Sequence, residues 1–147
     1  MPRPWQTIMS DKKILHVDII SPEKPVYSGT ASAVTAKAWD GEVGILPGHA
    51  PMVARLGIGE VRVTDGAGSE QKVHRFAIKQ GYLEVSHNKV VVLSEDAKAI
   101  ADLKGVNPAD IERLVKAIAE ETEPHRKAEL QADLEWLKSC DRLLKAM

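Results

Sequence analysis

The sequence is poor in several features that would point to common classes of function. Its 147 residues include a single cysteine, Cys140, and aromatic residues make up only 4% of the chain. One cysteine cannot build a disulfide framework or a thiolate zinc site within the chain, and this fits a reducing compartment. The formal net charge of −1 and the scarcity of aromatics argue against nucleic acid as a partner, because such proteins need a basic surface and stacking side chains.

Long hydrophobic runs are also missing. No uncharged apolar segment approaches the roughly 18 residues that a membrane-spanning helix requires. The segment from Met1 to Lys13 has no apolar core of signal-peptide length. If the protein works at a membrane, we therefore expect a partner to hold it there. Hydrophobic residues still make up 44% of the chain, and its length suits one domain, or one domain with an appendage.

The motifs of common catalytic and metal sites are absent as well. The sequence has no nucleophile elbow, no phosphate-binding Gly-Lys-Ser/Thr loop and no HExxH pair. Gly57-Ile58-Gly59 is too short for a dinucleotide fingerprint and more simply allows a strand to turn. The histidines, which show no i, i+2 or i, i+4 spacing, are His16, His49, His74, His87 and His125. We therefore expect neither an enzyme nor a metal site, and a small β-sandwich enzyme is the least favoured reading.

Residues 14 to about 93 are typical of a series of short β-strands. Residues 58–64 alternate between apolar and polar side chains, and turn signals separate the segments. Residues 72–78 are expected to pair with 81–85, and the apolar run 90–93 predicts a strand buried on both faces or lying between two sheets. Short strands at near-regular spacing predict an antiparallel sandwich or barrel.

The pattern changes to helical after this region. Asn107 is a good N-cap, and Pro108 suits the first helical position. Pro124 should end this helix, because a proline disfavours the αR conformation of the residue before it. A second helix is expected from about His125 towards the C-terminus. The apolar stripes are Ile111, Leu114, Val115 and Ile118 in the first helix, and Leu130, Leu134, Leu137 and Leu144 in the second.

These patterns predict an α+β chain, with an N-terminal antiparallel β-sandwich followed by a C-terminal antiparallel α-helical hairpin. We place an extension without recognisable pattern at residues 1–12, the β-sandwich domain at 13–96 and the helical hairpin domain at 97–147. Trp136 is expected to pack against the sandwich or the first helix.

Residues 41–52, GEVGILPGHAPM, form the most distinctive stretch of the chain. It holds three glycines and two prolines, which restrict a loop to a sharply defined shape. We expect a rigid loop that holds its polar side chains, Glu42 and His49, in place. Loops of defined shape on a rigid scaffold are where binding residues tend to lie.

Four segments in this order resemble the epsilon subunit of bacterial F-type ATP synthases. They are Val26–Gly29, the GEVGILPGHAPM run, Gly81–Val85 and Val90–Leu93. The resemblance implies a non-catalytic subunit of the central stalk, or rotor, which links the gamma subunit to the c-ring and couples the translocation of protons or sodium ions to ATP synthesis. It also implies a peripheral protein at the cytoplasmic face of the bacterial inner membrane.

The same resemblance implies a contact with the c-ring and gamma. The residues that match this contact are Gly41, Glu42, Gly44, Pro47, Gly48 and His49. In this interpretation the glycines and prolines supply a stiff shape, and Glu42 accepts from basic groups of the c-ring loops. The alternative is that Glu42 is a solvated turn residue and that His49 caps its own loop.

The resemblance further implies that the hairpin can extend and inhibit ATP hydrolysis at the catalytic alpha/beta head. The basic residues that could make this contact are Arg126, Lys127, Lys138, Arg142 and Lys145. The alternative is a solvated helix face, since acidic residues are plentiful there too.

Some family members bind ATP at the start of the hairpin, and Asp110 and Arg113 match part of that motif. At i, i+3 on a helix the two residues could equally form an ordinary surface ion pair. No cofactor is expected beyond ATP as a regulatory ligand. A nucleotide-sensing regulatory module is therefore the alternative function.

Overall fold

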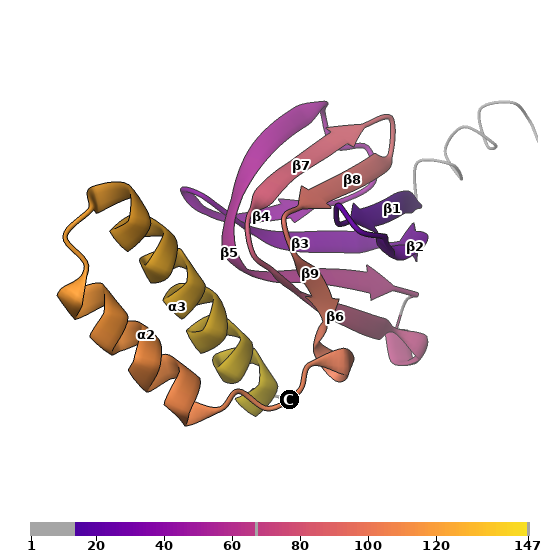
Figure 1. The fold of residues 1–147 in the computed structure, drawn as a ribbon. Helices are drawn as coiled ribbons and strands as arrows, with labels where there is room; N and C mark the ends of the chain where they lie inside the picture. The colour runs from indigo at the N-terminus through magenta and orange to yellow at the C-terminus, as the bar shows by residue number, and fades with distance from the viewer. Residues whose placement is uncertain (1–13, 67, 147) are drawn as a thin grey trace, which may run out of the picture. The chain divides into compact units, whose positions relative to one another are not determined.

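The computed structural model describes residues 14–66 and 68–146, so the extension expected at residues 1–12 lies outside the described residues. The chain divides into two compact units, one ending at Ala99 and the other beginning at Ile100. The α+β prediction, a β-sandwich followed by a helical hairpin, is confirmed (Figure 1). The sequence places residues 97–99 in the helical hairpin domain, but Ala97–Ala99 forms a short strand that pairs with Phe76–Ile78 of the first unit.

The described part of the first unit contains nine strands and one short 3₁₀ helix. They are β1 (Leu15–Ile20), β2 (Pro25–Ala31), β3 (Ala33–Ala38), β4 (Gly41–Ile45), β5 (Met52–Asp65), η1 (Gly68–Glu70), β6 (Lys72–Ile78), β7 (Gly81–Ser86), β8 (Lys89–Ser94) and β9 (Ala97–Ala99). The strand order is β2-β1-β8-β7-β5-β3-β4, with β6 paired to β5 and β9 paired to β6. β2 and β4 are therefore the outer strands of the main path.

The long strand β5 holds this arrangement together. It pairs with β7 through residues 52–56 and with β6 through residues 59–65, while β3 lies along its other edge. The change of partner falls at Gly57-Ile58-Gly59, where the sequence predicted that a strand turns. Because β5 pairs first with β7 and then with β6, the sheet folds into two layers that enclose a core (Figure 1).

The predicted pairing of residues 72–78 with 81–85 is wrong. β6 does not pair with β7; it pairs with β5 and β9, whereas β7 pairs with β5 and β8. Both strands instead pair with β5, which has 14 residues and can therefore pair with one strand near each of its ends. The sheet also contains one parallel pair, β1 with β8, so its strands are not all antiparallel.

The prediction for the apolar run 90–93 is wrong as well. Val90 and Val92 are buried, but Leu93 is 50% exposed and Val91 is only partly buried. The strand therefore has one face in the core and one towards solvent. An apolar run does not reveal this, because its outward residues are as hydrophobic as its inward ones.

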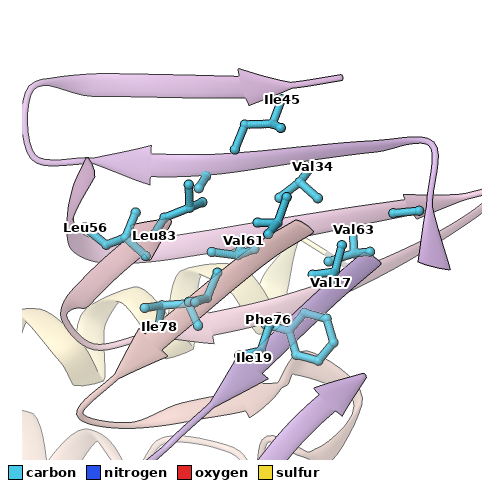
Figure 2. Packing of buried hydrophobic residues seen from close by; sticks show 14 of the residues in the cluster. Val17, Ile19, Val34, Ile45, Leu56, Val61, Val63, Phe76, Ile78 and Leu83 are labelled. Atoms are coloured by element: carbon cyan, nitrogen blue, oxygen red, sulfur yellow. The ribbon is translucent and has the colours of Figure 1, made fainter. Parts of the chain in front are cut away.

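The core lies between the two layers of the first unit. Alternate residues of each strand point inward, as in β1, where Leu15, Val17 and Ile19 are buried and His16 is exposed. Figure 2 shows β-branched and leucine side chains of several strands, together with Phe76, packed in one cluster. The ring of Phe76 also packs at 5.2 Å from that of Tyr27, measured between centroids, which joins β6 to β2.

The second unit contains η2 (Ile100–Asp102), α2 (Pro108–Glu120) and α3 (Pro124–Lys145). As predicted, Asn107 caps α2, and its side chain accepts a hydrogen bond from the Ala109 amide at 3.0 Å. Glu123 caps α3 by accepting from the amides of His125 and Arg126 at 3.0 and 2.7 Å. The two helices pack against each other as a hairpin. Among the described residues, no helix is long and apolar enough to cross a membrane.

The buried face of α3 differs from the predicted stripe. The leucines expected to form the stripe of α3 are only partly buried. The buried residues of this helix lie on another side of it, and they are Trp136, Ser139, Cys140 and Leu143. The prediction that Trp136 is a packing residue agrees with its burial. Periodicity missed this face because Ser139 and Cys140 are not typical stripe residues.

Gly81 offers a direct test of the pairing of β7 with β8. Its φ of +154° is rarely adopted by other residues, and a Cβ atom there would collide with the carbonyl oxygen of Leu93. We expect Gly81→Ala to lower the free energy of unfolding in urea by about 2–4 kcal/mol. Gly57→Ala is the matched control, because an added Cβ meets nothing within 4 Å. Equal unfolding midpoints for the two variants would contradict this account.

Candidate functional site

The distinctive segment 41–52 is not one continuous loop. Gly41–Ile45 forms strand β4, which pairs with β3, and only residues 46–51 are loop. The six candidate contact residues are therefore divided. Gly41, Glu42 and Gly44 lie on an outer strand of the sheet, and Pro47, Gly48 and His49 lie in the loop that follows it.

The loop 46–51 is held to a neighbouring turn. The Gly48 amide donates to Oδ1 of Asn88 at 2.7 Å, and the φ of +87° at Gly48 is one that glycine adopts without strain. Asn88 and His87 form the two-residue turn between β7 and β8, and both have positive φ. The loop therefore has a fixed connection to the end of another strand pair. The sequence gives no local sign of the role of Asn88, because its partner lies 40 residues away.

His49 makes its contacts inside the loop. Its amide donates to the Leu46 carbonyl at 3.1 Å, and its Nδ1 lies 2.7 Å from the Ala50 carbonyl oxygen. Leu46 exposes most of its side chain beside it. These bonds are those expected of a histidine that caps its own loop, and they also fix the ring on the surface of that loop.

Glu42 is a strand residue with an ion-pair partner rather than a solvated turn residue. Its Oε1 accepts from a terminal guanidinium nitrogen of Arg62 at 3.0 Å. Nε of Arg62 lies 3.6 Å from Oε1 of Glu60, and Glu60 accepts two hydrogen bonds from Arg75 at 2.9 and 2.8 Å. We call these four residues the charge ladder; it crosses the outward face from β4 to β6. The hydrogen bond with Glu60 raises the pKa of Arg75, against the lowering effect of burial.

Glu60, Arg62 and Arg75 were not singled out from the sequence. The alternation of residues 58–64 does place Glu60 and Arg62 on one face of a strand, but nothing local connects them with Glu42 or Arg75. Their meeting depends on β3 lying between β4 and β5, which is a property of the sheet order.

A second exposed surface lies on the outward face of β5, β7, β8 and β1. Arg55, Tyr82, Leu93 and Ile20 are successive register partners across these four strands. Trp39 stacks on Arg55, with the guanidinium carbon 4.5 Å from the ring centroid. We call these five residues the outer apolar row. Trp39 is 69% and Tyr82 55% exposed, so the row presents a large apolar area to solvent.

The basic residues of the hairpin differ in their surroundings. Arg126 pairs with Glu121 at 3.3 Å, and Lys145 pairs with Asp141 at 2.9 Å. No ion pair holds Lys127, Lys138 or Arg142 among the residues that the structure describes. The spacings of 11 and 4 residues place these three on one side of α3.

The structure brings Asp110 and Arg113 together on the first turns of α2. Their side chains form an i, i+3 ion pair of 2.5 Å, in which Arg113 is exposed and Asp110 is partly buried. This is the ordinary surface pair that the spacing also allowed.

Comparison with known protein families and structures agrees with this architecture. Residues 14–100 match the family model described as ATP synthase, Delta/Epsilon chain, beta-sandwich domain. The ATP synthase epsilon chain of Alkalilimnicola ehrlichii is 37% identical over 134 residues, which cover 88% of this chain and 94% of the relative. That of Thioalkalivibrio sulfidiphilus is 40% identical over 131 residues, covering 89% and 86%.

Solved structures with the same fold include a chain of the Euglena gracilis mitochondrial ATP synthase (OSCP/F1/c-ring). It has a TM-score of 0.67 at 18% identity and covers 90% of this chain and 82% of that one. A chain from the central stalk/c-ring of the Tetrahymena thermophila mitochondrial ATP synthase has a TM-score of 0.64 at 13% identity, covering 88% and 96%. At these identities the likeness concerns the fold. With the family match over the β-sandwich and relatives similar along nearly their whole length, the chain belongs to the ATP synthase epsilon chains, which are non-catalytic subunits of that enzyme.

Proposed function

We propose that this chain joins the gamma subunit to the c-ring in the rotor of a bacterial ATP synthase, so that rotation driven by protons or sodium ions reaches the catalytic head. The observation that carries the proposal is that the first unit has two exposed surfaces of different chemistry. One is the anchored loop 46–51 with Glu42 on the neighbouring strand, and the other is the outer apolar row. A subunit that connects two partners needs two such surfaces.

The loop and Glu42 suit the polar loops of the c-ring. A joint that transmits torque has to resist deformation, and the bond from Gly48 to Asn88 ties the loop to the strand pair β7–β8. Glu42 offers a carboxylate oxygen to a basic group of the partner. We place the chain, by this contact, at the cytoplasmic face of the inner membrane.

The outer apolar row suits a permanent partner, and gamma is the stalk subunit that we assign to it. Permanent interfaces are more apolar than transient ones, and aromatic residues and arginine are enriched at their centres. Tyr82, Trp39 and Arg55 supply this composition. The row rests on four paired strands and so presents a preformed surface, which lowers the entropy lost on binding.

The hairpin is our candidate for an inhibitory contact with the alpha/beta head. Lys127, Lys138 and Arg142 share one side of α3 and keep their charges unpaired within the described residues. An acidic segment of the head would meet these charges without first breaking an internal ion pair. Arg126 and Lys145 would have to exchange partners to contribute.

Gamma binding is tested by polar replacements in the outer apolar row. Burial of the Tyr82 side chain, and likewise of the Leu93 side chain, should contribute about 1.5–3 kcal/mol to the free energy of binding. We therefore expect Tyr82→Ser with Leu93→Ser to weaken gamma binding at least about 10-fold in a titration with purified gamma. Val73→Ser, an exposed valine outside the row, is the control. Undiminished binding of the double variant would show that gamma docks elsewhere.

The loop should matter for coupling rather than for folding. Glu42→Ala with His49→Ala removes exposed polar groups, so the free energy of unfolding should change by no more than about 1 kcal/mol. ATP-driven ion pumping by the complex should fall more than ATP hydrolysis does. Glu23→Ala serves as the control, because it removes an exposed charge that belongs neither to β4 nor to the loop 46–51. A double variant that pumps like the wild type would contradict the c-ring contact.

The inhibitory contact predicts a difference between two groups of basic residues. In the assembled enzyme, Lys127→Gln, Lys138→Gln and Arg142→Gln together should raise the rate of ATP hydrolysis. Replacing Arg126 and Lys145 by glutamine should raise it less, because their charges are already paired. The effect should shrink at high salt, which screens exposed charges. Equal hydrolysis rates for the wild type and both variants would mean that these charges do not inhibit.

A further inference from the structure

The two glutamates of the charge ladder differ in their exposure and in the number of hydrogen bonds that they accept. Glu60 is 19% exposed and receives two hydrogen bonds from Arg75, a geometry that fixes both side chains. Glu42 at the opposite end is 63% exposed and is bound through Oε1 alone. Arg62 stands between them and faces a carboxylate on either side. The inner end of the ladder is therefore anchored, and the outer end is presented to solvent.

No other cation in the described residues is paired with Glu42. Lys37 is its register partner on β3, but the stem of Lys37 lies towards β5, where a Cβ atom added to Gly59 would meet its Cδ at 2.6 Å. The second carboxylate oxygen of Glu42, Oε2, has no hydrogen-bond donor in the part of the chain that the structure describes. One oxygen of Glu42 is held, and the other is available.

We propose that Arg62 is a positioning residue for partner recognition: anchored by Glu60 and Arg75, it holds Glu42 so that Oε2 accepts from a basic side chain of the partner subunit. This rests on the proposed contact at Glu42. A glutamate on an outer strand has three rotatable bonds, and ordering them on binding costs affinity. Arg62 orders the carboxylate before the partner arrives, which is the general advantage of a preorganised surface.

The planar guanidinium is suited to this role. Arginine can pair with two carboxylates at the same time: a terminal nitrogen of Arg62 lies 3.0 Å from Glu42, and its Nε lies 3.6 Å from Glu60. A lysine at this position carries one compact charge and can pair closely with only one of the carboxylates at a time. Arg62→Lys should therefore be intermediate between the wild type and Arg62→Gln.

The test is a double-mutant cycle on the full chain. An ATP synthase complex depleted of this subunit is titrated with the wild type, Glu42→Gln, Arg62→Gln and the double variant, and the dissociation constants are compared. Each single variant should bind about 3- to 10-fold more weakly. The double variant should bind no more weakly than Glu42→Gln alone, because Arg62 acts through Glu42. Lys72→Gln removes an exposed charge from β6 and should leave binding unchanged.

The outcomes separate the inference from the function on which it rests. If Glu42→Gln weakens binding and Arg62→Gln does not, the positioning role is wrong and the Glu42 contact stands. If Arg62→Gln weakens binding by the same factor with or without Glu42, Arg62 touches the partner itself and the inference is overturned. If Glu42→Gln has no effect, the contact at Glu42 fails too. Urea unfolding of each variant identifies any loss of binding that stems from a less stable fold.

Discussion

The first unit depends on the pairing of one strand, β5, with three others. β3 runs along one edge of β5, while the other edge pairs with β7 up to Leu56 and with β6 from Gly59 onward. The same strand supplies Arg55 to the outer apolar row and Glu60 and Arg62 to the charge ladder. The strand that joins the two layers therefore contributes to the outer apolar row and also holds the residues that support Glu42, so a load applied at either place reaches the core through backbone hydrogen bonds.

Local chemistry made the elements predictable. Asn107, Pro108 and Pro124 mark the helix ends because capping and proline geometry act within a few residues. The alternating burial of residues 58–64 in β5 is of the same kind. The fold class and the family likewise followed from short segments, each of which could be recognised by itself, and from their order along the chain.

The errors and omissions concern contacts between distant segments. The pairing of β6 with β7 was expected because the two are neighbours in sequence, whereas the length of β5 gave each a different place. Asn88 and Arg62 were missed because their partners lie 40 and 20 residues away. The loop 46–51 could be recognised by its glycines and prolines, but what holds it and Glu42 depends on sheet order, which periodicity does not encode.

The parallel pairing of β1 with β8 has a consequence for how the chain is made. β1 lies between β2 and β8, so during synthesis it cannot complete its hydrogen bonds until residues 89–94 have followed. Contacts so far apart in sequence slow folding, because a long loop must close before they form. During synthesis one edge of β1 stays open to other chains. The helical hairpin is translated after the residues that close this edge.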